Sequence, residues 1–165
     1  MMTYKTLTAG LLAASMLTAP AFADDMTMVK EVDVDVELED LANANAAAHW
    51  TMIEDDLENA IVERLVGRTD DEGVRISIDI DEIELANTLQ NAAGVADSSL
   101  SGRVKILSPN DNSKFETYDL SVAFDQAILF LPEGFDVTAL TTDSKEYYDG
   151  MIAAFADHVV KRLDG

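Results

Sequence analysis

The sequence predicts a two-layer α/β sandwich of the α+β type, in which two helices cover one face of a mainly antiparallel or mixed sheet of four to five strands. The strand segments carry an apolar residue at every second position, as in Val74, Ile76, Ile78 and Ile80, which is typical of a sheet with one buried face. Two other segments repeat apolar residues every three or four positions, which is typical of amphipathic helices. Helix-on-sheet packing buries all these apolar faces and leaves the other sheet face wet and acidic.

Residues 1–23 differ from the rest of the chain and predict a secretory signal peptide. Lys5 is their only charged residue, residues 7–17 form an apolar core, and Ala21, Phe22 and Ala23 provide a small-x-small cleavage site. A stable membrane-spanning helix needs about 20 apolar residues, more than this core contains. We therefore expect export to the periplasm or the medium, with residues 24–165 forming a single α/β domain.

Composition narrows the possible chemistry and partners. The chain contains no cysteine, which excludes disulfides, cysteine-based metal sites and a lipidated N-terminal cysteine. Its formal net charge is −21. Because nucleic acids and anionic membrane surfaces bind to basic patches, we do not expect either as a partner of this acidic chain. Cations and basic proteins are better suited to its negative charge.

The first strand is expected at residues 29–39 and the first helix at residues 41–66. Asp40 is a candidate helix N-cap, Gly67 a helix terminator, and Trp50 a core residue. The expected inward-facing residues are Val32, Val34, Val36 and Leu38 from the strand and Trp50, Ile53, Leu57, Ile61 and Leu65 from the helix.

The second strand, residues 74–85, loses its apolar phase after Ile80. A β-bulge near Asp81 and Glu82 would return Ile83 to the core; the alternative is that the strand ends at Asp81. Two acidic-faced strands repel each other if they lie side by side, so either they are kept apart, or cations or a basic strand relieve the repulsion.

The third strand, residues 100–107, has the only basic face. If it lies antiparallel beside the second strand, Arg103 and Lys105 could meet Asp79 and Asp81. The fourth strand follows a turn at residues 108–113, and its expected inward-facing residues are Tyr118, Leu120, Val122 and Phe124.

The apolar run at residues 127–135 is expected to be buried; exposed, it would be a candidate protein contact. Asp143 and Glu146 predict a capping-box start for the closing helix. Its apolar stripe consists of Tyr147, Met151, Phe155, Val159 and Leu163.

Candidate chemistry is limited to carboxylates. His49 and His158 lack a second ligand at helical spacing, and no catalytic constellation or phosphate-binding glycine loop is present. Hard cations such as calcium bind clustered carboxylate oxygens. The candidate calcium ligands are Asp33, Asp35, Glu37, Asp79, Asp81, Glu82 and Glu84.

The order of elements around Leu100-Ser101-Gly102-Arg103-Val104 resembles small α/β proteins of the bacterial envelope, many of them lipoproteins of unassigned function. The resemblance implies the fold and an envelope location but transfers no functional residue, and the missing lipidation cysteine departs from it. We expect an exported, non-catalytic binding or interaction module, with another envelope protein as its partner. Calcium binding is the alternative, and an enzyme is the third hypothesis.

Overall fold

The computed structural model describes residues 26–36, 50–84, 99–109, 115–136 and 144–164. Their strands are β1 (Val29–Val36), β2 (Val74–Glu84), β3 (Ser99–Leu107) and β4 (Phe115–Ala123), which form one sheet in the order β1-β2-β3-β4. β1 runs parallel to β2, and the other neighbours are antiparallel. The predicted mixed four-stranded sheet is confirmed.

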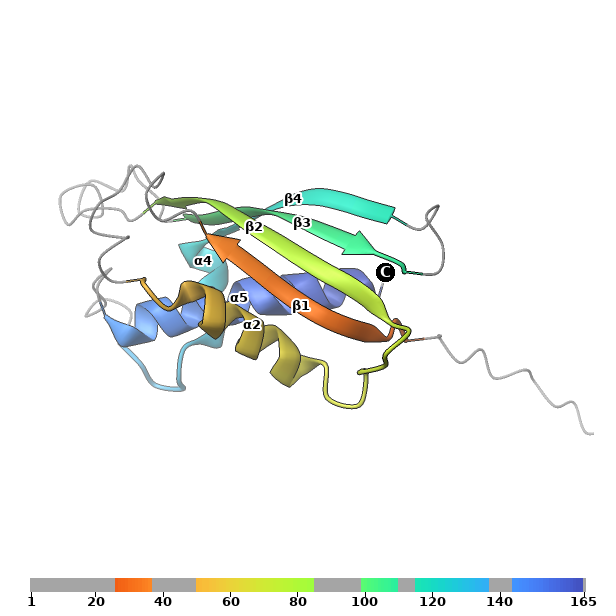
Figure 1. Cartoon of the computed structure of the whole chain (residues 1–165). Coiled ribbons are helices and arrows are strands. Elements are labelled where there is room, and N and C mark those ends of the chain that lie inside the picture. Colours follow the sequence, from red (N-terminus) through yellow and green to blue (C-terminus); the bar gives the residue numbers. More distant parts are fainter. Residues whose placement is uncertain (1–25, 37–49, 85–98, 110–114, 137–143, 165) are drawn as a thin grey trace, which may run out of the picture.

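The helices α2 (Ile53–Arg64) and α5 (Lys145–Leu163) lie side by side beneath one face of this sheet (Figure 1). α2 packs against β1, and α5 packs against β3 and β4. The short helix α4 (Phe124–Ala127) and the 3-10 turn η1 (Ile128–Phe130) follow β4 and pack on α5. The described elements therefore form the two layers expected from the sequence.

The core lies between the layers and contains the predicted apolar stripes. The completely buried side chains include Ile76, Ile78, Leu100, Val104 and Val122 from the sheet and Ile53, Leu57, Ile61, Met151, Phe155 and Val159 from the helices. Each such side chain contributes about 1.5–3 kcal/mol by leaving water. Val34 and Val36 are also buried, whereas Glu37, Leu38 and Glu39 lie outside the described residues.

The predicted bulge in β2 is confirmed. The register with β3 shifts between Ile80 and Glu82, β2 continues to Glu84, and Ile83 is buried again. Termination of the strand at Asp81 is therefore wrong. Gly102 lies opposite Ile80, where an added Cβ would stand 2.7 Å from the Asp79 carbonyl oxygen, so only glycine fits this close approach.

The predicted register of the basic strand is correct at one of its two positions. Arg103 lies opposite Asp79, but Lys105 lies opposite Ser77, because two steps forward along β3 are two steps back along its antiparallel neighbour β2. Asp81 lies in the bulge and has no partner in the β2–β3 register. Arg103 forms its ion pair with Asp119 on β4, with 3.1 Å between Nε and Oδ1. The two acidic strands are not kept apart, since β1 and β2 are neighbours.

The first helix begins later than predicted within the described chain. Trp50, Thr51 and Met52 precede α2 in a turn, while Asp40 and residues 41–49 lie outside the described residues. Glu54, Asp55 and Asp56 occupy the first turn, where carboxylates stabilise the positive end of the helix dipole. After the helix, Gly67 adopts a positive φ of 79°, as its predicted role as terminator requires.

Two details of the C-terminal half differ from expectation. Ser144 caps α5 by accepting a hydrogen bond from the Tyr147 amide, and Asp143 lies outside the described residues. The run at 127–135 is not wholly buried: Ala127 is covered by α5, but Leu129 is 83% exposed because four consecutive apolar residues cannot share one face. Phe124 starts α4 and does not belong to β4, yet it still stacks on Tyr147.

Candidate functional site

The predicted calcium ligands lie along two neighbouring strands. Asp33 and Asp35 are exposed on β1, and Asp79, Asp81 and Glu82 are exposed on β2. Glu84 ends β2, and Glu37 lies outside the described residues. Asp35 is opposite Asp79, whereas Asp33 is opposite Ser77. In the described ranges, no three acidic or histidine side chains gather closely enough to hold a metal ion, and the calcium hypothesis stays a prediction.

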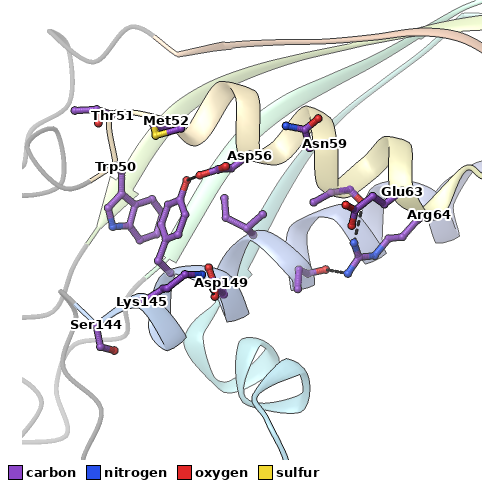
Figure 2. Close-up of a pocket in the computed structure, with 14 residues that line it drawn as sticks. Trp50, Thr51, Met52, Asp56, Asn59, Glu63, Arg64, Ser144, Lys145 and Asp149 are labelled. Carbon is purple, nitrogen blue, oxygen red and sulfur yellow. Dashed lines mark hydrogen bonds and ion pairs between the residues drawn. The ribbon is translucent and has the colours of Figure 1, made fainter.

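A groove between α2 and α5 is a better candidate site. Its volume is about 840 Å³, within the range of about 300–1,000 Å³ that is common for ligand sites. Figure 2 shows Asp56, Asn59 and Glu63 on the α2 side and Lys145 and Asp149 on the α5 side. Small and apolar side chains complete the lining between them, namely Ala60, Ile152 and Ala153.

One end of the groove is aromatic. Trp50 is buried and meets the ring of Tyr148 edge-on, with 5.1 Å between the centroids. The Tyr148 hydroxyl donates a hydrogen bond of 2.6 Å to the Asp56 carboxylate. Burial, and then this hydrogen bond, raise the pKa of Tyr148 well above its usual range. The hydroxyl is therefore a fixed donor at neutral pH, and it holds Asp56 in place.

The rest of the groove has more carboxylates than cations. Its carboxylates are Asp56, Glu63 and Asp149, and its cations are Lys145 and Arg64. Lys145 is paired with Asp149, whose hydrogen bond and negative charge raise the pKa of the ammonium group. The guanidinium of Arg64 donates to the carbonyls of Ala60 and Ala153, at 2.7 and 3.3 Å, and thereby ties α2 to α5.

Sequence reasoning missed this groove. The apolar stripe predicted for the closing helix runs through Tyr147 and does not include the adjacent Tyr148, which lines the groove. The available signal was weak: Tyr148 and Ile152 lie four residues apart on α5, next to its predicted apolar stripe, and Trp50 precedes α2. No periodicity in the sequence shows how far apart two helices lie.

No protein-family model matches the sequence, and no curated protein matches it significantly. Among solved structures, protein XCC0632 from Xanthomonas campestris, of family DUF330, is similar at 11% identity over 88% of each chain, with a TM-score of 0.46. A dodecameric PelC from Paraburkholderia phytofirmans is similar at 8% identity over 88% of this chain and 92% of its own, also with a TM-score of 0.46.

A minor lipoprotein from Acinetobacter baumannii is similar at 14% identity over 82% of this chain and 92% of its own, with a TM-score of 0.35. At these scores the similarities assign neither a family nor a function. Within the described part of the chain, no helix is both long and apolar enough to cross a membrane.

Proposed function

We propose that the protein is an exported, non-catalytic binding module of the bacterial envelope, and that the groove between α2 and α5 binds a basic segment of another polypeptide. The observation that carries the proposal is the lining of the groove, in which an apolar floor lies between carboxylates that outnumber the cations. Export rests on the predicted signal peptide at residues 1–23.

The groove has the two features that such a segment needs. The partly exposed Ala60, Tyr148 and Ala153 offer an apolar surface to an anchoring side chain. Glu63 offers an acceptor to lysine or arginine, and Asp149, which pairs with Lys145, adds a second. Because the chain carries a net charge of −21, its field also attracts basic partners and accelerates their association.

Tryptophan fluorescence tests the proposal directly, since Trp50 is the only tryptophan and lies in the groove. The probe is a tryptophan-free amphipathic peptide of lysine and leucine, and the control peptide carries glutamate in place of lysine. We expect saturable binding of the basic peptide alone, weakened by salt because the attraction is electrostatic.

Matched variants separate the groove from the general charge. Glu63→Gln should weaken binding about threefold, as expected for one charge at the rim of an interface. Asp33→Asn removes the same charge from the exposed face of β1 and should leave the affinity close to wild type. Absence of saturable binding, or equal weakening by both variants, would overturn the proposal.

Calcium binding remains the alternative, favoured by the cross-strand pair of Asp35 and Asp79. Calorimetric titration distinguishes the two. Saturable heat at low stoichiometry that Asp79→Asn abolishes would support a calcium site. Weak heat without saturation that disappears in salt would indicate a diffuse ion atmosphere.

A further inference from the structure

The two edge strands of the sheet, β1 and β4, differ in how their outer backbone groups are hydrogen-bonded. At the β1 edge, the amide of Val34 donates to Glu58 Oε1 at 3.1 Å, and the amide of Val36 donates to Glu54 Oε1 at 3.0 Å. Both glutamates belong to α2. An exposed strand edge offers its unpaired backbone groups to other chains, so these two side chains close the β1 edge against strand addition.

The β4 edge has no such cover in the described chain. β4 is the last strand of the sheet, it pairs with β3 over its whole length, and the described residues add no further strand to its outer side. At its C-terminal end, the Ala123 amide donates to the side chain of Gln126. β4 is nine residues long in all, about 30 Å of strand, and the part before Ala123 is open.

The charges along β4 are neutralised locally. Arg162 of α5 donates from Nε to Glu116 at 2.7 Å, and its guanidinium lies 5.3 Å from the ring centroid of Tyr118. Arg103 pairs with Asp119, and Lys105 lies opposite Thr117. Along β3 and β4 these three cations thus accompany the carboxylates Glu116 and Asp119, and the exposed Asp125 of α4 adds a third carboxylate beyond the C-terminal end of β4.

The same side of the molecule exposes apolar side chains. Phe115, 58% exposed, lies opposite Leu107, 38% exposed, at the start of β4. In the helical layer, α5 separates α2 from α4 and η1, so α4 and η1 lie toward the β4 side (Figure 1). There Leu129 is 83% exposed.

We propose that β4 pairs with β4 of a second copy of this chain, antiparallel and about a two-fold axis, to form a homodimer with one continuous sheet. A strand edge is complementary to itself in the antiparallel sense, and a two-fold axis closes the assembly. Two copies with a net charge of −21 repel each other, and the ion pairs of Glu116 and Asp119 lower that repulsion along β4. The antiparallel pairing brings η1 of one copy toward the end of β4 that carries Glu116 and Arg162 in the other.

Sedimentation equilibrium on the mature chain tests the dimer across micromolar to millimolar concentrations. It is run in about 0.1 M and about 1 M sodium chloride, between which the Debye length falls from about 10 to about 3 Å. We expect a reversible monomer–dimer equilibrium that salt strengthens, because the charges that remain between the copies are alike. A chain that stays monomeric under both conditions overturns the proposal, and that outcome leaves the β4 edge to a strand from a different protein.

Three variants locate the interface. Phe115→Asp and Leu129→Asp should each weaken dimerisation about tenfold or more, in the range of a central interface residue. Val66→Asp introduces the same charge at an 84% exposed valine beyond the end of α2, on the closed side, and should behave like wild type. Circular dichroism spectra check that all three are folded. Equal weakening by all three variants would show a general charge effect and would contradict a β4 interface.

Discussion

At the scale of single residues, Tyr148 links the stability of the protein to its candidate groove. Its hydroxyl donates to the charged Asp56, and its ring contacts Trp50. A hydrogen bond to a charged group contributes about 1.5–3 kcal/mol when buried, and less at the half-buried position of Tyr148. Tyr148→Phe should therefore lower the free energy of unfolding by about 1 kcal/mol at neutral pH, measured by urea denaturation.

The same variant should change the response to alkaline pH. Burial is the main cause that raises the pKa of Tyr118 to about 12, and burial with the Asp56 hydrogen bond raises the pKa of Tyr148. Below about pH 10 these tyrosines are protonated in both folded and unfolded chains, and their stabilisation is complete. Between about pH 10 and 12 only the unfolded chain loses the protons, so stability falls with pH.

The slope is at most about 1.4 kcal/mol per pH unit for each tyrosine. Tyr148→Phe removes one of the groups with a raised pKa and should therefore reduce the slope, while Tyr118 and Lys145 continue to titrate. Identical slopes for the wild type and the variant would show that Tyr148 does not retain its proton in the folded state.

Single residues also show where prediction from the sequence stopped. The alternation of the two strands predicted that Arg103 and Asp79 share one face of the sheet, but alternation does not fix the register, and Lys105 lies opposite Ser77. The ion pair of Arg103 with Asp119 depends on β4 being the other neighbour of β3. The alternation of apolar and polar residues in β3 does not show which strand lies beside it. Likewise, the apolarity of Trp50 predicted its burial but not its place in a turn ahead of α2.

At the scale of elements, the closed β1 edge makes a prediction for amide exchange. Glu58→Ala removes the acceptor of the Val34 amide, while Glu54 still accepts from Val36. Exchange at Val34 should accelerate about fivefold, corresponding to a lost hydrogen bond of roughly 1 kcal/mol, with Val36 as the internal reference. Hydrogen exchange followed by NMR measures both amides in one sample. Unchanged exchange at Val34 would mean that Glu58 does not close the edge in solution.

The bulge between β2 and β3 makes a second prediction. In Gly102→Ala the new Cβ would lie 2.7 Å from the Asp79 carbonyl oxygen, and the backbone of β2 must move to admit it. We expect a loss of about 1–3 kcal/mol in the free energy of unfolding. Thr117→Ala on exposed β4 is the control, with an expected change within about 0.5 kcal/mol. A Gly102→Ala protein as stable as this control would contradict the close approach.

At the scale of the whole molecule, the two layers could be predicted because every element has one apolar face, and only helix-on-sheet packing buries all of them. The parallel β1–β2 pair is explained by the α2 crossover that joins these strands, but it was not among the features predicted from the sequence. The groove could not be predicted, since it depends on side chains from two helices that are distant in sequence and on the spacing that the core imposes between them.

The net charge of the molecule makes the last prediction. With a charge of −21, and with Asp35 opposite Asp79 across two neighbouring strands, repulsion opposes the folded state. Raising sodium chloride from about 0.1 to about 1 M should therefore increase the free energy of unfolding. Asp35→Asn should stabilise the protein by about 0.5 kcal/mol at low salt, the size of one cross-strand repulsion, and should reduce the salt dependence. Asp71→Asn, in an exposed turn, is the control of equal charge. Thermal and urea unfolding give the free energy of unfolding of the wild type and of both variants. Equal effects of the two substitutions would show that the repulsion comes from the net charge and not from the pairing of β1 with β2.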